Sequence, residues 1–290
     1  MGVCAHFSRY AKFHSKEVHM KKGILRTAVI LLLLFVPIYN FVGIAAEGTE
    51  TVSEPSVTDI SAVDELVHQN VAQIEAKIDR IDEEKRINKL LLEQKKEREQ
   101  NEKRLREQIK SGAVTYRQIF ADTLIVGDSL MKGLRTHGII DSANMITMVN
   151  AHLSHLASNI GTIINNNPKV LILHYGINMI ELSDAHLNNF IKNYSSHISK
   201  IKAALPGTRI IVSGLFRPSD EAIAHTSRFG RTPQYNAALK NMCETLGVEF
   251  LDNGKLLKGT EDVYTNDGVH FKKSFYTDTW LPYTVLELGL

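Results

Sequence analysis

The stretch TLIVGDSL, residues 123–130, decides the fold of the C-terminal part of this 290-residue chain. Four apolar or β-branched residues run directly into Gly-Asp-Ser, and an apolar run that ends at a glycine is typical of a buried strand. The next residues, Leu130 to Arg135, predict the start of a helix. Ser129 then lies at a strand-to-helix junction, where backbone N–H groups favour negative charge. Such a serine suits a nucleophile whose attack creates an oxyanion, and it equally suits a helix N-cap.

Strand and helix patterns alternate from Tyr116 onward. The predicted strands are Thr123–Val126, Met145–Val149, Val170–His174, Arg209–Ser213 and Val248–Leu251. The predicted helices are Leu130–His137, Leu153–Asn165, Asn188–Leu205 and Asn236–Leu246. A last helix is expected from Tyr276 to Leu286, where Pro282 either kinks the helix or marks its start. This alternation predicts an α/β fold in which helices cover both faces of a parallel sheet.

Two later segments place further polar residues at characteristic positions. The third predicted strand runs into Tyr-Gly-Ile-Asn178, and residues 266–270 read Asn-Asp-Gly-Val-His. With Ser129, these segments resemble the SGNH hydrolase family, also called GDSL esterases. The sequence GDSL at 127–130 is similar to the family's first block, GIN at 176–178 to its third, and DGVH at 267–270 to its fifth. The resemblance covers roughly Tyr116 to Leu290, and it implies a flavodoxin-like three-layer α/β/α fold.

Acyl transfer needs a nucleophile, a base and a site for the oxyanion. Ser129 is the candidate nucleophile, and His270 can take its proton because an imidazole titrates near neutral pH. Asp267 would hold the ring in the required tautomer, since the short spacing puts it and His270 on one side of a tight loop. Taken alone, DGVH is typical of an ordinary turn with a surface histidine. Together with the other blocks, it predicts a catalytic triad.

For the oxyanion, the resemblance implies two donors, the Ser129 backbone N–H and the Asn178 side-chain amide. The family usually adds a glycine N–H from the loop after the second strand. That loop here reads NAHLSH at residues 150–155 and contains no glycine. The N–H of Ala151 or of His152 could take the place of the glycine N–H, or His152 could contact the substrate instead.

Three further residues are candidates for substrate binding, namely Asp128, Arg217 and Arg231. The two arginines belong to a loop after the fourth strand, whose basic residues could meet an anionic or polyhydroxyl substrate. A solvated loop explains them equally well. No cofactor or metal is expected, because the histidines occur without a zinc pattern such as H-E-x-x-H.

The first part of the chain predicts export. Residues 1–23 form a basic tail, and residues 24–46 are nearly all apolar, close to the length that spans a bilayer. The positive flank predicts that the chain beyond the apolar segment lies outside the cytoplasm. The apolar segment is either a transmembrane anchor or a signal peptide, since small residues near Ala45 offer a cleavage point. Residues 47–63 predict a flexible linker.

A long helical stalk is predicted at residues 64–112, ahead of a catalytic domain at 113–290. Its first part has apolar residues in steps of four and three, which is a heptad seam: Val67, Val71, Ile74, Ile78 and Ile81. The seam favours a coiled-coil homodimer or a spacer that holds the enzyme off the membrane. Two clean heptads also fit a single solvated helix. A net charge of +2 without a sustained basic face excludes a nucleic-acid binder.

These patterns predict an extracytoplasmic serine esterase that removes acetyl or similar groups from a cell-envelope glycan. An O-acetyltransferase with the same triad is the alternative within catalysis, because an acyl-enzyme can pass its acyl group to a sugar hydroxyl. A catalytically silent, membrane-anchored binding module is the alternative outside catalysis.

Overall fold

The computed structural model of this chain describes residues 57–290, and only the backbone for residues 57–63. The predicted basic tail, the apolar segment at 24–46 and most of the linker lie outside the described residues. Within residues 57–290, none of the helices has the length and apolar character that crossing a bilayer requires. The chain divides into two compact units, one that ends at Leu91 and one from Leu92 to Leu290.

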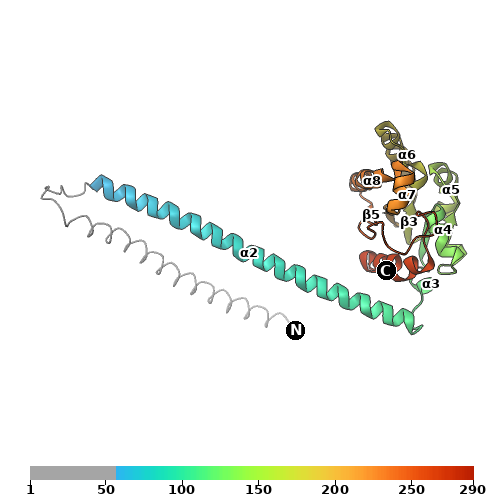
Figure 1. Cartoon of the computed structure of the whole chain (residues 1–290), viewed down its shortest axis with the longest axis horizontal. Helices are drawn as coiled ribbons and strands as arrows, with labels where there is room; N and C mark the ends of the chain where they lie inside the picture. The colour runs from blue at the N-terminus through green and yellow to red at the C-terminus, as the bar shows by residue number, and fades with distance from the viewer. Residues whose placement is uncertain (1–56) are drawn as a thin grey trace. The chain divides into compact units, whose positions relative to one another are not determined.

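Helix α2, Val57–Lys110, contains the predicted seam in its first half (Figure 1). Within the first unit the seam is open to solvent, with Ile74 39% and Ile81 49% exposed. Ion pairs within the helix support its exposed surface, as between Arg86 and Glu83 at 2.8 Å. The self-association of this helix stays a prediction.

A coiled coil would make the oligomeric state depend on the seam. We expect a fragment of residues 47–290 to sediment as a dimer at micromolar concentration, because pairing would cover the exposed isoleucines. The double variant Ile74→Asp, Ile81→Asp should sediment as a monomer, whereas Leu66→Asp, outside the seam, should leave the dimer intact. A wild-type fragment that stays monomeric at high concentration would remove the coiled-coil interpretation.

The second unit is built on a five-stranded sheet, which confirms the predicted α/β class. Its strands are β1 (Thr123–Gly127), β2 (Met145–Thr147), β3 (Val170–His174), β4 (Arg209–Ser213) and β5 (Glu249–Leu251). All pairs are parallel and the order is β2-β1-β3-β4-β5. The strand order reverses direction between β1 and β3, and ligands of open parallel sheets bind beyond the carboxyl ends of the strands at such a point.

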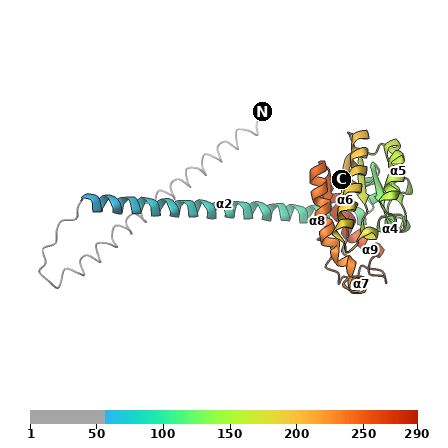
Figure 2. The same ribbon diagram turned by 90° about the horizontal axis from the view of Figure 1, so that it is seen from above.

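Helices cover both faces of the sheet. The long ones are α4 (Ser129–Thr136), α5 (Leu153–Asn166), α6 (Asp184–Ala204), α8 (Thr232–Leu246) and α10 (Leu281–Leu288). Right-handed crossovers put α5, α6 and α8 on one face and α4 on the other. In agreement, α6 packs against both α5 and α8, and α6 and α8 lie side by side in both views (Figures 1 and 2).

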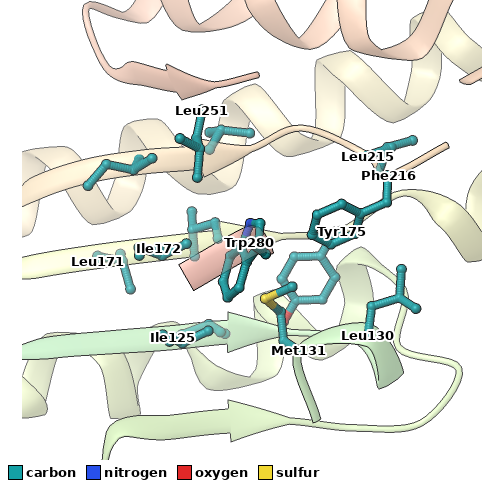
Figure 3. Packing of buried hydrophobic residues seen from close by; sticks show 14 of the residues in the cluster. Ile125, Leu130, Met131, Leu171, Ile172, Tyr175, Leu215, Phe216, Leu251 and Trp280 are labelled. Atoms are coloured by element: carbon teal, nitrogen blue, oxygen red, sulfur yellow. The ribbon is translucent and has the colours of Figure 1, made fainter. Parts of the chain in front are cut away.

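Short helical elements connect these parts. They are α3 (Tyr116–Ile119), α7 (Asp220–His225), α9 (Lys273–Phe275) and the 3-10 turns η1 (Ser142–Asn144), η2 (Ile177–Met179) and η3 (Ser227–Arg231). One buried cluster joins β1, β3 and β5 to the C-terminal segment (Figure 3). Trp280 and Phe216 meet edge to face within it, with ring centroids 6.0 Å apart.

The C-terminal segment differs from the single helix predicted at Tyr276–Leu286. A π-helical turn, η4 (Tyr276–Trp280), comes first, and Pro282 is the second residue of α10, which continues directly from it. Carbonyls of the π turn accept from distant side chains: the Tyr116 hydroxyl donates to Thr277 at 2.9 Å, and Arg106 to Asp278 at 2.7 Å.

Arg106 belongs to the last part of α2, which packs on the globular unit. Leu105 of the same part is buried in the common core, and Arg98 pairs with Glu287 at 2.6 Å. The last part of α2, from Leu92 onward, therefore belongs to the same compact unit as the sheet.

Candidate active site

Ser129 is the first residue of α4, directly beyond the carboxyl end of β1. The side chain of Asp128 caps this helix, because its carboxylate accepts from the Leu130 N–H at 3.0 Å. Gly127 is required by the close approach of β3: a Cβ there would lie 2.7 Å from the His174 carbonyl oxygen. The strand end and the cap together fix the Ser129 backbone at the point where the strand order reverses.

The structure brings Ser129, His270 and Asp267 into one hydrogen-bonded chain. His270 Nε2 lies 2.8 Å from Ser129 Oγ, and His270 Nδ1 lies 2.5 Å from Asp267 Oδ2. Ser129 and His270 are 141 residues apart in sequence, so only the tertiary fold makes this contact. Each nitrogen of the ring faces one partner, which is the geometry of a base held by a carboxylate on one side and facing a nucleophile on the other.

The carboxylate of Asp267 is held by a dense set of donors. Its Oδ1 accepts from the Val269 N–H, the His270 N–H and the Thr265 hydroxyl, each at 2.9 Å. Partial burial alone would raise the pKa of Asp267, but these hydrogen bonds and the bond to the His270 ring outweigh it and hold the pKa well below its ordinary range. Asp267 is therefore ionised near neutral pH and can stabilise an imidazolium.

Ser219, which the sequence analysis did not single out, packs against the turn that carries Asp267 and His270. Gly268 has a φ of +67°, and a Cβ there would lie 2.1 Å from the Ser219 hydroxyl oxygen. The Ser219 N–H donates to the Gly268 carbonyl at 2.8 Å. Ser219 also caps α7. This contact spans two distant loops, so no local pattern could have revealed it.

The predicted oxyanion donors converge from two loops. Asn178 lies on η2, after β3, and its side-chain amide donates to the Ala151 carbonyl at 3.3 Å, in the loop after β2. Within the described residues, the N–H groups of Ala151 and His152 have no hydrogen-bond partner. The Ser129 N–H is likewise an unpaired donor of a helix N-terminus. The Asn178 side chain and the loop after β2 thus meet beyond the carboxyl ends of the strands, where an oxyanion site would lie.

The three predicted substrate-binding residues are occupied elsewhere. Asp128 is fully buried and serves the helix cap, so it is closed to a substrate. The guanidinium of Arg217 pairs with Asp220 at 2.6 Å and donates to the Pro218 carbonyl. Arg231, whose side chain is 12% exposed, binds Asp184 and the Glu181 carbonyl. Asp128 and Arg217 thus have partners nearby in the sequence, whereas the partners of Arg231 lie 47 and 50 residues away.

The histidines near the strand ends also have separate partners. His155 Nδ1 lies 2.7 Å from the Tyr175 hydroxyl, and the buried His174 Nδ1 lies 3.2 Å from the Ser213 hydroxyl. His152 is exposed at the start of α5. In the part of the chain that the structure describes, no three His, Cys, Asp or Glu side chains gather as metal ligands would.

The pKa of the Asp128 carboxyl group is raised in the folded protein. One carboxylate oxygen has no partner among the described residues, and burial raises the pKa to about 7, although the bond from the Leu130 N–H lowers it. The unfolded carboxyl ionises near its ordinary pKa of about 4, whereas the folded one keeps its proton until pH 7. The folded state therefore binds more protons in this window, and its stability falls as the pH rises.

We expect wild type to lose on the order of 2 kcal/mol of unfolding free energy between about pH 5 and pH 8, relative to Asp128→Asn, which cannot ionise. Urea unfolding at the two pH values measures this difference. Asp122→Asn is the matched control, because the Asp122 side chain is 65% exposed and should follow wild type. An identical pH dependence of wild type and Asp128→Asn would contradict a buried, protonated carboxyl.

Comparisons with known proteins give a match to one family model and several similar solved structures. Residues 140–277 match the GDSL-like lipase/acylhydrolase family. This range contains Asn178, Asp267 and His270 but begins after Ser129, so the position of Ser129 depends on the structure. No curated protein matches the chain.

Several solved structures are similar to this chain. A GDSL-like lipase from Bacteroides thetaiotaomicron is 16% identical, with a TM-score of 0.43 over 64% of this chain and 98% of that one. A lipase/acylhydrolase from Enterococcus faecalis is 14% identical, with a TM-score of 0.42 over 57% and 94%. An acetyl xylan esterase is 17% identical, with a TM-score of 0.39 over 57% and 96%.

Proposed function

The chain belongs to the GDSL-like lipase/acylhydrolase family, and from this premise we propose that it is a serine esterase that deacetylates a cell-envelope glycan outside the cytoplasm. Members of the family hydrolyse esters. The observation that carries the reaction type is the continuous hydrogen-bonded chain Ser129–His270–Asp267. The location and the glycan are supported by the export pattern of residues 1–46 and by the resemblance stated above.

In the first step, Ser129 Oγ bonds to the carbonyl carbon of the ester while His270 Nε2 takes the hydroxyl proton. The electron pair of the carbonyl moves to its oxygen, which the Ser129 N–H and the Asn178 amide stabilise. The tetrahedral intermediate then expels the alcohol oxygen, which leaves with the proton from His270. An acyl-serine remains on the enzyme.

Water completes the cycle by the same route. His270 takes a proton from water as its oxygen attacks the acyl carbon, and the bond to Ser129 Oγ breaks as that oxygen recovers the proton. The carboxylic acid is released and the triad is restored. Throughout, Asp267 stabilises the imidazolium and keeps Nε2 directed at the serine.

An O-acetyltransferase remains the second candidate, and one observation favours it. The loop after β2 carries no glycine, and the unpaired N–H groups of Ala151 and His152 stand where the family usually has a glycine N–H. A site of this kind that hydrolyses slowly would pass its acyl group to a sugar hydroxyl in place of water. A silent binding module, by contrast, has no chemical need for an aligned triad.

The deciding experiment uses the full chain with p-nitrophenyl acetate, followed by mass spectrometry of the trapped acyl-enzyme. We expect an acetyl group on the peptide that contains Ser129, and release of acetate from O-acetylated peptidoglycan without added acceptor. Acetate release that requires a deacetylated glycan acceptor would assign the transferase. Absence of both the acyl-enzyme and turnover with either ester would favour the binding module.

A further inference from the structure

We propose that Tyr235 and Arg231 are positioning residues that hold Asn178 in the oxyanion site. The inference rests on the proposed function, because it concerns how one donor of that site is kept in place. Arg231 is the last residue of η3 and Tyr235 lies in the first turn of α8, both more than 50 residues beyond Asn178. They act on the backbone directly after Asn178 rather than on the substrate.

The need for such support arises from the local structure. The β3 ladder ends at His174, and Asn178 lies four residues beyond it on η2, a single 3-10 turn. A turn of this kind has poor hydrogen-bond geometry and few internal bonds. One backbone bond, from the Met179 N–H to the Gly176 carbonyl at 2.8 Å, closes it. Further anchoring must come from outside the turn.

Tyr235 anchors the turn because its hydroxyl acts both as a hydrogen-bond donor and as an acceptor. The hydroxyl donates to the Met179 carbonyl at 3.0 Å and accepts from the Glu181 N–H at 3.0 Å. Its ring is fully buried and packs on Phe190, with ring centroids 5.5 Å apart. The hydroxyl is therefore held rigidly, and it bridges two backbone groups directly after Asn178.

Arg231 adds a third bond, four residues earlier than Tyr235 in the chain. Its Nη1 donates to the Glu181 carbonyl at 2.8 Å, and its Nη2 binds the carboxylate of Asp184. Three polar backbone groups at residues 179–181 thus bind two side chains of α8 and η3. On the other side, the Asn178 amide binds the Ala151 carbonyl, so the asparagine is located between two fixed points.

This arrangement predicts a specific kinetic defect. A displacement of about 1 Å of a catalytic group can cost about 10²-fold in rate. An oxyanion donor acts on the charge that develops in the transition state, so its misplacement lowers kcat and leaves KM nearly unchanged. Tyr235→Phe removes both hydrogen bonds but keeps the buried ring, and it should lower kcat about 10-fold with KM within about twofold.

The test measures p-nitrophenyl acetate turnover by the full chain in a double-mutant cycle with Asn178→Ala. If Tyr235 acts through Asn178, Tyr235→Phe should cause no further loss in the Asn178→Ala background. The matched control is Tyr283→Phe, which removes a hydroxyl bonded to the Asp252 carbonyl at 2.7 Å and should keep the wild-type kcat. An unchanged kcat in Tyr235→Phe, or an equal loss in both backgrounds, would overturn the proposal.

A second measurement does not require activity. Hydrogen exchange of the peptide that spans residues 176–184 should be faster in Tyr235→Phe, because the Glu181 N–H loses its acceptor, and unchanged in Tyr283→Phe. Unchanged exchange in Tyr235→Phe would overturn the positioning role. Faster exchange in a protein without esterase activity would refute the proposed function while leaving the positioning role in place.

Discussion

Replacing Ser129 by alanine is expected to lower kcat for p-nitrophenyl acetate on the order of 10⁴-fold or more, because the variant loses the hydroxyl that faces the base. His270→Ala should cause a loss of similar size, since the serine hydroxyl is a weak nucleophile without proton removal. The double variant should be no worse than either single variant, because the two residues act as one unit.

The measurement compares kcat of the three variants with wild type, alongside thermal unfolding. Within the described residues, the Ser129 side chain makes one hydrogen bond, to His270. Removing the hydroxyl should therefore change the free energy of unfolding by less than about 0.5 kcal/mol. Ser158→Ala is the matched control, because that hydroxyl donates to the Ser154 carbonyl of the same helix, α5, at 3.0 Å. A loss of a few fold in Ser129→Ala, or losses that multiply in the double variant, would exclude the acyl-serine mechanism.

Asp267→Asn is expected to lower kcat about 10⁴-fold near neutral pH, the loss that accompanies a wrong histidine tautomer. The reason lies in the unequal surroundings of the two carboxylate oxygens. Oδ1 accepts from three donors, so the amide oxygen of an asparagine would take that place. The NH₂ group would then face His270 Nδ1 and donate to it. Nε2 would carry the proton and could no longer accept one from Ser129.

This prediction is checked by kcat of Asp267→Asn against Asp262→Asn, a control in the same loop. Asp262 is exposed and pairs with Lys272, so its amide should leave turnover within about twofold of wild type. A crystal structure of the variant would show whether the His270 ring keeps its orientation. Turnover within about tenfold of wild type in Asp267→Asn would mean that the carboxylate does not set the tautomer.

Much of the fold could be predicted because its signals are local. Apolar runs ended by glycine or by a polar residue located all five strands, and the strand limits at Val170–His174 and Arg209–Ser213 agree with the structure. The strand β2 is shorter than predicted, since it ends at Thr147 on the sheet edge, where the apolar Met148 and Val149 are exposed. The resemblance carried by the GDSL, GIN and DGVH segments implied a triad of Ser129, Asp267 and His270, and the structure joins these three side chains by hydrogen bonds.

The sequence by itself therefore determined the class of fold, the order of its elements and the residues of the triad. Tertiary structure alone decided that Asp128 is buried and that Arg231 binds Asp184 and the Glu181 carbonyl, although both side chains look available in the sequence. Tertiary structure also places Ser219 against Gly268, 49 residues away in the sequence. In the same way it places Tyr235 against Met179, 56 residues away. The periodicity of a sequence indicates which face of its own helix or strand a residue occupies. Periodicity does not indicate which distant loop contacts that residue in the folded protein. Those contacts set the geometry of the site.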